Sequence, residues 1–166
     1  RWDDAMALLR RAMAANCKKV VGYPMIHYYI GYCHARKGEA ATARESRRPA
    51  ASLPPEGCFP YGQESWQVLC DAVAADPGDA RAWLFLGNLL YNHQPEEAMK
   101  AWTRAAAAEP ELALAKRNLA FGYRRANQPA LALDLLSQAL NIDHSNPRWI
   151  VEFDALLAQV GEDPKR

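Results

Sequence analysis

One set of spacings recurs three times in this chain. In each copy a small residue is followed by two alanines and then by a proline or a histidine. The copies are Gly31, Ala43, Ala50 and Pro55; Gly87, Ala98, Ala105 and Pro110; and Ala120, Ala132, Ala139 and His144. The intervals are 12, 7 and 5 residues, except that the second copy lacks one residue of the first interval. Small residues at fixed offsets mark close approach of helix backbones, so the recurrence predicts stacked pairs of antiparallel helices.

Composition agrees with an all-α protein and excludes several partners. Hydrophobic residues make up 50% of the 166 residues, and much of that share is alanine, the strongest helix former. The formal net charge of +1 gives no electrostatic reason to expect nucleic acid or an anionic membrane. No apolar run approaches the ~20 residues that span a bilayer. The four cysteines form no CxxC pair, so we expect a reduced, cytoplasmic protein.

The last two copies give the clearest repeats, over residues 80–110 and 113–144. Asp79 is placed to cap a helix from residue 80 to about residue 91. Pro95 suits the first turn of a second helix, which ends before Pro110. The next repeat follows the same plan. Each repeat is therefore expected to be an αα-hairpin whose apolar faces need a neighbour to cover them.

The first repeat, residues 24–55, departs from this plan. Gly38 is a plausible cap for the end of its first helix. In its second helix Arg47 stands where the other repeats have Trp102 and Leu136, and Pro49 follows two residues later. A proline inside a helix costs about 3 kcal/mol, so we expect a kink or an early end there.

Unpaired helices complete the predicted architecture. Residues 2–16 match the second half of a repeat, residues 63–75 form an extra helix after a loop at 53–62, and a terminal helix covers 147–160. The expectation is one right-handed α-solenoid of about nine helices, interrupted near 53–62. We expect the 63–75 helix to pack beside the helix that ends near Ser52, anchored by Phe59 and Trp66. Beginning on half a hairpin also suggests a fragment of a longer protein.

The pattern resembles the tetratricopeptide repeat (TPR), whose period is about 34 residues. The resemblance covers nearly the whole chain and is strongest over 79–144. The stretches 23–33 and 51–60 are also similar to the TPR region of large bacterial proteins that carry a sugar-mutarotase-like β domain. That likeness implies a bacterial parent protein linked to carbohydrate metabolism.

The TPR resemblance further implies a concave groove lined by the first helix of each pair. The matching positions of the predicted site hold Tyr28, Tyr32, Arg81, Asn88, Tyr91, Arg117, Phe121 and Arg124; Met25, Ala35, Leu84 and Leu114 complete the rows. Arginines beside aromatic rings suit an extended peptide with a carboxylate. A chaperone-tail clamp would match at Asn88 and Arg117 alone, so a full clamp is not expected. A solvated polar face at these two residues stays open.

Nothing in the sequence indicates catalysis. No GxSxG, HExxH, CxxC or glycine-rich phosphate loop occurs. The histidines His27, His34, His93 and His144 are interpreted as structural or solvated, with no metal site. Cys58 lies in the Gly/Pro-rich loop and is the cysteine most open to reaction, although packing of that loop through Phe59 is the better account of it. We therefore expect no enzyme activity, cofactor or metal.

Two functions agree with these features. The first is a non-catalytic scaffold that binds a peptide, a protein or a neighbouring domain of the parent chain in its groove. The second is an accessory segment of a bacterial carbohydrate-active enzyme, with His27, Tyr28 or Tyr32 contributing to a substrate pocket. Aromatic rings bearing hydroxyl groups would suit either surface.

Overall fold

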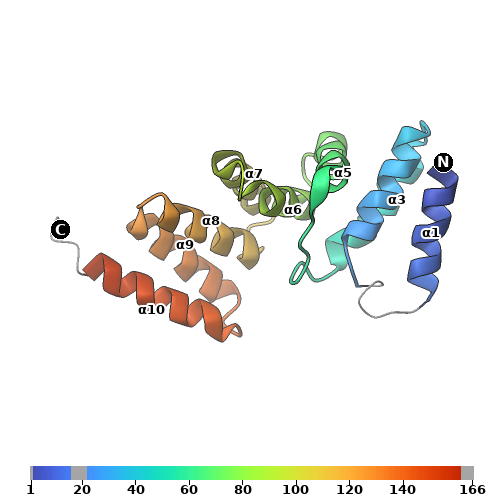
Figure 1. The fold of residues 1–166 in the computed structure, drawn as a ribbon. Coiled ribbons are helices and arrows are strands. Elements are labelled where there is room, and N and C mark those ends of the chain that lie inside the picture. Colours follow the sequence, from blue (N-terminus) through green and yellow to red (C-terminus); the bar gives the residue numbers. More distant parts are fainter. Residues whose placement is uncertain (1, 16–21, 162–166) are drawn as a thin grey trace. The chain divides into compact units, whose positions relative to one another are not determined.

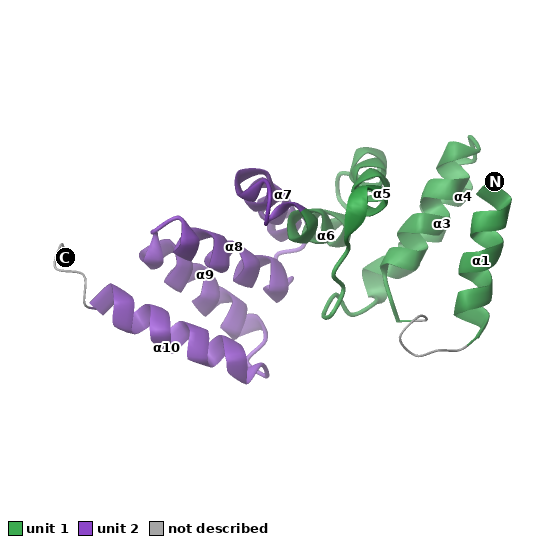
Figure 2. Ribbon diagram, in the orientation of Figure 1, with its two compact units in different colours: residues 1–89 green, residues 90–166 purple. Residues whose placement is uncertain are grey.

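The computed structural model describes residues 2–15 and 22–161. Over these residues the chain forms nine α-helices and one 3-10 helix, with no strand (Figure 1). It divides into two compact units, residues 1–89 and residues 90–166 (Figure 2). Each unit is described by itself below.

Unit 1 is organised around one central helix, α3 (Met25–Arg36). The helices α1 (Trp2–Ala14), α4 (Ala40–Arg47) and α5 (Gly62–Ala75) pack against it, as does the 3-10 helix η1 (Arg48–Ser52). The last helix that begins in this unit is α6 (Ala80–Leu90). Because α3 contacts elements on several sides, most of its side chains are at least partly covered.

Unit 2 stacks its helices in chain order. The order is α7 (Pro95–Ala108), α8 (Ala113–Arg125), α9 (Pro129–Ile142) and α10 (Pro147–Gly161), and each packs on the next. Its core includes Ala120, Ala132 and Ala139, the three small residues of the third copy of the spacing. Trp149 and Leu156 of α10 complete this core.

The two equivalent hairpin turns use the same backbone conformation. Gly38 has φ of +82°, and Asn127, at the matching repeat position, has φ of +57°. Each follows the last turn of a first helix, where a left-handed residue closes off the helical hydrogen bonds. The following N–H groups, of Glu39 and Gln128, then bond back to carbonyls of α3 and α8 at 3.0 Å and 2.9 Å.

Gly31 allows the two helices of the first hairpin to approach closely. A Cβ atom at this position would lie 2.6 Å from Cγ of Arg47 and 3.0 Å from the backbone oxygen of Ala43. The Arg47 side chain therefore crosses α3 where any larger residue would block it. It is 7% exposed, and its guanidinium pairs with Asp71 of α5. The α-helix ends at Arg47 and continues as η1, which confirms the early end expected from Pro49.

A second buried polar contact joins α3 to the start of α6. Asp79 caps α6 by accepting a hydrogen bond from the N–H of Ala82 at 2.9 Å, as predicted. The hydroxyl of Tyr28 lies 2.9 Å and 3.0 Å from the two carboxylate oxygens of Asp79. The Tyr28 ring is fully buried and meets Phe85 edge-on. Burial raises the pKa of Tyr28 and the pKa of Asp79.

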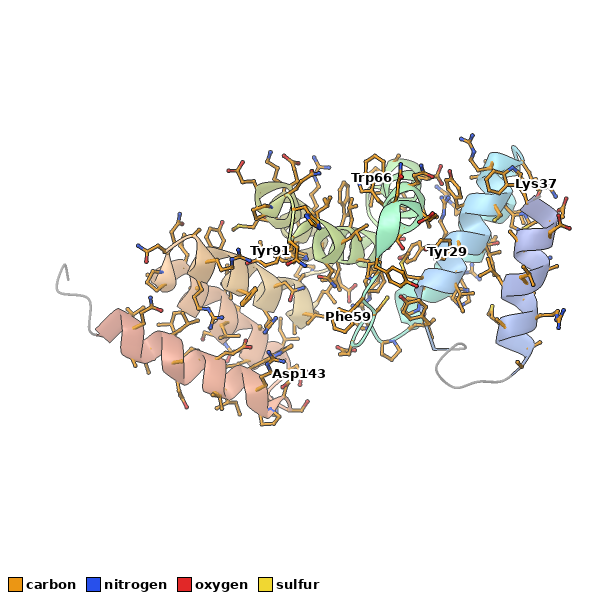
Figure 3. The ribbon with its side chains drawn as sticks, in the orientation of Figure 1. Tyr29, Lys37, Phe59, Trp66, Tyr91 and Asp143 are labelled. Atoms are coloured by element: carbon orange, nitrogen blue, oxygen red, sulfur yellow. The ribbon has the colours of Figure 1, made fainter. Side chains whose placement is uncertain are left out.

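The predicted anchors of the interruption are wrong. Phe59 is 73% exposed and Trp66 is 44% exposed (Figure 3). Cys58 and Pro60 are buried instead. Buried and exposed side chains therefore alternate along this segment, and Phe59 is an exposed one. Helix α5 packs against α3 through its other face, with Ser65 bonded to the hydroxyl of Tyr29 at 2.8 Å. Periodicity alone does not tell which face of this lone helix a neighbour covers.

Substituting Gly31 by alanine should cost stability that the same substitution at Gly122, a helix glycine two residues after the equivalent repeat position, does not. A Cβ at Gly122 would meet only the flexible side chain of Met99, at 3.0 Å and 3.1 Å. In a helix interior alanine is favoured over glycine by about 0.5–1 kcal/mol. We expect Gly31→Ala to destabilise the protein by about 1–3 kcal/mol through overpacking, and Gly122→Ala to change stability by less than about 1 kcal/mol. Urea unfolding followed by circular dichroism measures both, and a stabilising Gly31→Ala would contradict the close approach.

Cys58 should be slow to alkylate in the native protein. Its side chain is 2% exposed, and burial raises the pKa of its thiol to about 11. At about pH 8 little of it is therefore thiolate, the form that reacts. Iodoacetamide labelling followed by peptide mass spectrometry should show Cys58 reacting more slowly than the partly exposed Cys70, with the difference lost in urea. Equal native rates would contradict this assignment.

Candidate functional site

Helix α8 presents three of the predicted groove residues on one face. Arg117, Phe121 and Arg124 lie at spacings of four and three residues, so the helix places them above one another. All three are partly exposed. The structure brings them together with Tyr91, which follows α6, and with Glu152 of α10. We call this set of five residues the α8 face.

Three aromatic rings form the floor of the α8 face. The Tyr91 ring centroid lies 5.0 Å from that of Trp102 and 5.5 Å from that of Phe121. Trp102 is buried in the second helix of its repeat, whereas Tyr91 and Phe121 are partly exposed (Tyr91 is labelled in Figure 3). The Tyr91 hydroxyl is buried and has no hydrogen-bond partner among the described residues. A rigid ring cluster of this kind offers apolar area with few side-chain rotamers to freeze.

Guanidinium groups cover these rings. The carbons at the centres of the Arg117 and Arg124 guanidiniums lie 5.4 Å and 5.0 Å from the Phe121 centroid. Arg125 lies over Tyr91 at 5.1 Å. Cation–π contacts at partly exposed sites contribute about 0.5–1 kcal/mol each. Their larger effect here is to hold the arginine side chains in place.

The arginines differ in their ionic partners. Arg117 pairs with both carboxylate oxygens of Glu152, from Nε at 3.1 Å and from Nη2 at 2.6 Å. Arg148, one turn earlier on α10, also reaches Glu152 at 3.4 Å. Within residues 2–15 and 22–161, Arg124 and Arg125 contact ring faces and form no ion pair. We call Arg125 and Arg148 the margin of the α8 face. Glu152 therefore balances the charge of Arg117, whereas no carboxylate of the described residues pairs with Arg124 or Arg125.

A small cleft opens beside Phe121. The space inside it that a water molecule can enter is about 10 Å³, which is room for about one water. It is lined by Arg117, Ala120, Phe121, Arg124, Leu136, Glu152 and Leu156. The lining combines an apolar base from Ala120, Leu136 and Leu156 with charged groups at the margin. A cleft of this size admits neither a drug-sized molecule nor a whole side chain, so a bound segment could only lie across its mouth, over Phe121.

The predicted groove residues on α3, in unit 1, are covered by other parts of the chain. Tyr28 is wrong as a groove residue because it is fully buried against Phe85 and Asp79. Met25 and Leu84, on the same predicted rows, are also fully buried. Tyr32 is partly exposed and packs edge-on against Trp2 of α1, with centroids 6.0 Å apart. Different neighbours therefore cover the two tyrosines of α3: Asp79 and Phe85 of α6 cover Tyr28, and α1 covers Tyr32.

Arg81 and Asn88, on α6, are half-buried and each makes polar or electrostatic contacts within the protein. Their place in one groove with the α8 face stays a prediction, because they belong to unit 1. Of the predicted residues, the structure brings together Tyr91, Arg117, Phe121 and Arg124.

His27 and His34 both lie on α3. His34 is buried between Glu39, 2.5 Å from its Nδ1, and Arg10 of α1, 3.4 Å from its Nε2. Lys37 also pairs with Asp3, at 2.7 Å. The contacts of His34 and Lys37 thus link α3 and the turn after it to α1. Burial lowers the pKa of His27. In the described part of the chain no three His, Cys, Asp or Glu side chains gather as a metal site.

Sequence reasoning missed Glu152 and Arg125. Glu152 lies 35 residues after Arg117, close to one repeat period, so the period itself pointed to the neighbouring helix. It could not show that the two side chains meet. Arg125 lies at the end of α8, where a basic residue is expected simply because it complements the helix dipole. No helix among the described residues is both long enough and apolar enough to cross a membrane.

Comparisons with known proteins bear on the fold. No protein-family model matches the sequence, and no curated protein is similar to it. Among solved structures, PilF of Pseudomonas aeruginosa is 21% identical with a TM-score of 0.53, over 97% of this chain and 62% of that one. The chain thus spans less than two thirds of that protein.

Two further structures are shorter and match along most of their length. TTC0263, a TPR protein of Thermus thermophilus, is 18% identical with a TM-score of 0.52, over 95% of this chain and 91% of that one. YrrB, a TPR protein described as having an unusual peptide-binding site, is 19% identical with a TM-score of 0.50, over 91% and 82%. At these identities the likeness concerns the fold. This chain has the all-α fold of a TPR solenoid.

Proposed function

We propose that this chain is a non-catalytic TPR scaffold that binds an extended segment of another protein, and that the α8 face is part of the binding surface. The observation behind the proposal is a pair of arginines, Arg124 and Arg125, that are held on aromatic rings without a carboxylate partner in the described chain. The partly exposed ring of Phe121 adds an apolar surface for a side chain of that segment.

The contacts of Arg124 and Arg125 favour binding over a purely structural role for these two side chains. The pairing of Arg117 with Glu152 joins α8 to α10 and so accounts for itself within the fold. Arg124 and Arg125 make no such join, and nearby rings stay partly open to solvent. Aromatic residues and arginine are the types enriched where proteins bind one another. YrrB, with a similar fold, is a precedent for peptide binding on such a scaffold.

The carbohydrate-enzyme alternative has lost its main support. It relied on the aromatic cluster of α3, yet Tyr28 is buried and Tyr32 packs against Trp2. No observation on the described residues favours it over protein binding.

A peptide-display selection tests the proposal. Random dodecapeptides on phage are selected on the whole chain and then measured against Phe121→Leu, which keeps an apolar side chain but removes the ring beneath two arginines. We expect selected peptides to bind Phe121→Leu about tenfold or more weakly, the range of a lost interface anchor. The control is Leu131→Ala, an exposed leucine of α9 that does not line the cleft.

Circular dichroism should show the same helical signal for both variants. A selection that yields no binding peptide would contradict a binding surface on the α8 face. The same holds if the selected peptides bind Phe121→Leu and Leu131→Ala as tightly as they bind the wild-type protein.

A further inference from the structure

We infer that the segment bound at the α8 face is recognised through an acidic side chain within it, paired with Arg124, while a neighbouring apolar side chain packs on the partly exposed Phe121 ring. This inference rests on the proposed function and names the chemistry of the partner. It is carried by the charges and the ring contacts.

The charge of the α8 face and its margin is positive. Four arginines lie there, at positions 117, 124, 125 and 148, and among the described residues Glu152 is the carboxylate that pairs with any of them. Glu152 is already shared between Arg117 and Arg148. Arg124 and Arg125 thus leave an uncompensated positive charge beside the cleft, which an acidic residue of the partner would neutralise.

The contact with Phe121 leaves the N–H donors of Arg124 without a hydrogen-bond partner among the described residues, so they can bind a carboxylate. A guanidinium meets a ring through its flat face, as the contact with Phe121 allows, and its N–H donors lie in the plane of the group. Those donors match the two oxygens of a carboxylate. Since the ring already restricts the side chain, less conformational entropy is lost when the pair forms.

The structure favours a side-chain carboxylate within the segment over a C-terminal carboxylate held by Arg117. Glu152 occupies Nε and Nη2 of Arg117. A terminal carboxylate bound there would have to displace Glu152 and then lie beside it, with repulsion between like charges. At Arg124, in the last turn of α8, the segment can present a side chain and continue past the helix.

The same geometry favours a protein over a nucleic acid. The chain as a whole is nearly balanced, with 20 basic and 19 acidic residues. A phosphate backbone needs a run of cations, whereas this face places a glutamate among them. The partly exposed Phe121 ring suits an aliphatic side chain next to the acid.

Oriented peptide libraries test the inference on the whole chain. Three biotinylated heptapeptide libraries, amidated at the C-terminus, carry Glu, Gln or Lys at the central position and random residues elsewhere. We expect the wild-type protein to retain the Glu library about tenfold better than the Gln library, a typical gain for a charge-assisted hydrogen bond at a partly exposed site. Sequencing of the retained Glu peptides should show aliphatic residues next to the fixed position.

The variant Arg124→Gln, Arg125→Gln should lower the Glu preference to less than about twofold, with the Phe121 ring still present. The matched control is Arg36→Gln. Arg36 also lies in the last turn of a first helix, in α3, and makes no ion pair or ring contact with any described residue. This control should keep the full preference.

The outcomes separate the inference from the function on which it rests. Libraries that bind in a Phe121-dependent way but without preference for Glu would overturn the acidic-segment inference and leave peptide binding standing. No binding of any library would overturn both. Competition by an oligouridine as strong as that of the selected peptides, lost in the Arg124→Gln, Arg125→Gln variant, would also overturn it in favour of a nucleic acid.

Discussion

The close approach of α3 and α4 at Gly31 is the constraint on which unit 1 depends. With no side chain at this position, the two helices meet closely enough for Arg47 to lie across α3. A guanidinium that is 7% exposed requires a negative partner, because an isolated buried charge costs several kcal/mol. Asp71 of α5 supplies it. The extra helix that interrupts the repeat is thus also the element that makes the irregular first hairpin possible.

Unit 2 shows the same architecture without that exception. Its small residues Ala120, Ala132 and Ala139 meet in the core, and apolar Leu136 fills the position that Arg47 holds in unit 1. No charge has to be neutralised at that position of the hairpin. Charged groups lie instead on the α8 face, where Glu152 pairs with Arg117 while Arg124 and Arg125 rest on aromatic rings. A regular core leaves its polar side chains available at the surface.

Much of the fold could be predicted because its causes are local. The stop at Arg47 follows from the missing N–H of Pro49, and the cap by Asp79 follows from its place before an apolar run. The turn at Gly38 needs a left-handed residue. The exposure of Phe59 and Trp66 and the burial of Tyr28 could not be found in this way. They depend on which neighbour covers a given face, and periodicity carries no information about neighbours.

The sequence by itself determined the class of fold, the approximate helix boundaries and the absence of recognisable catalytic motifs, since these rest on spacing, propensity and residue type. Tertiary structure decided which candidates share a surface. It buried Tyr28 by setting Asp79, 51 residues further along the chain, against its hydroxyl. It also paired Arg117 with Glu152 and left Arg124 stacked on Phe121. The reason is physical: a side chain's burial and charge balance depend on contacts between helices, and these exist only once the helices have packed.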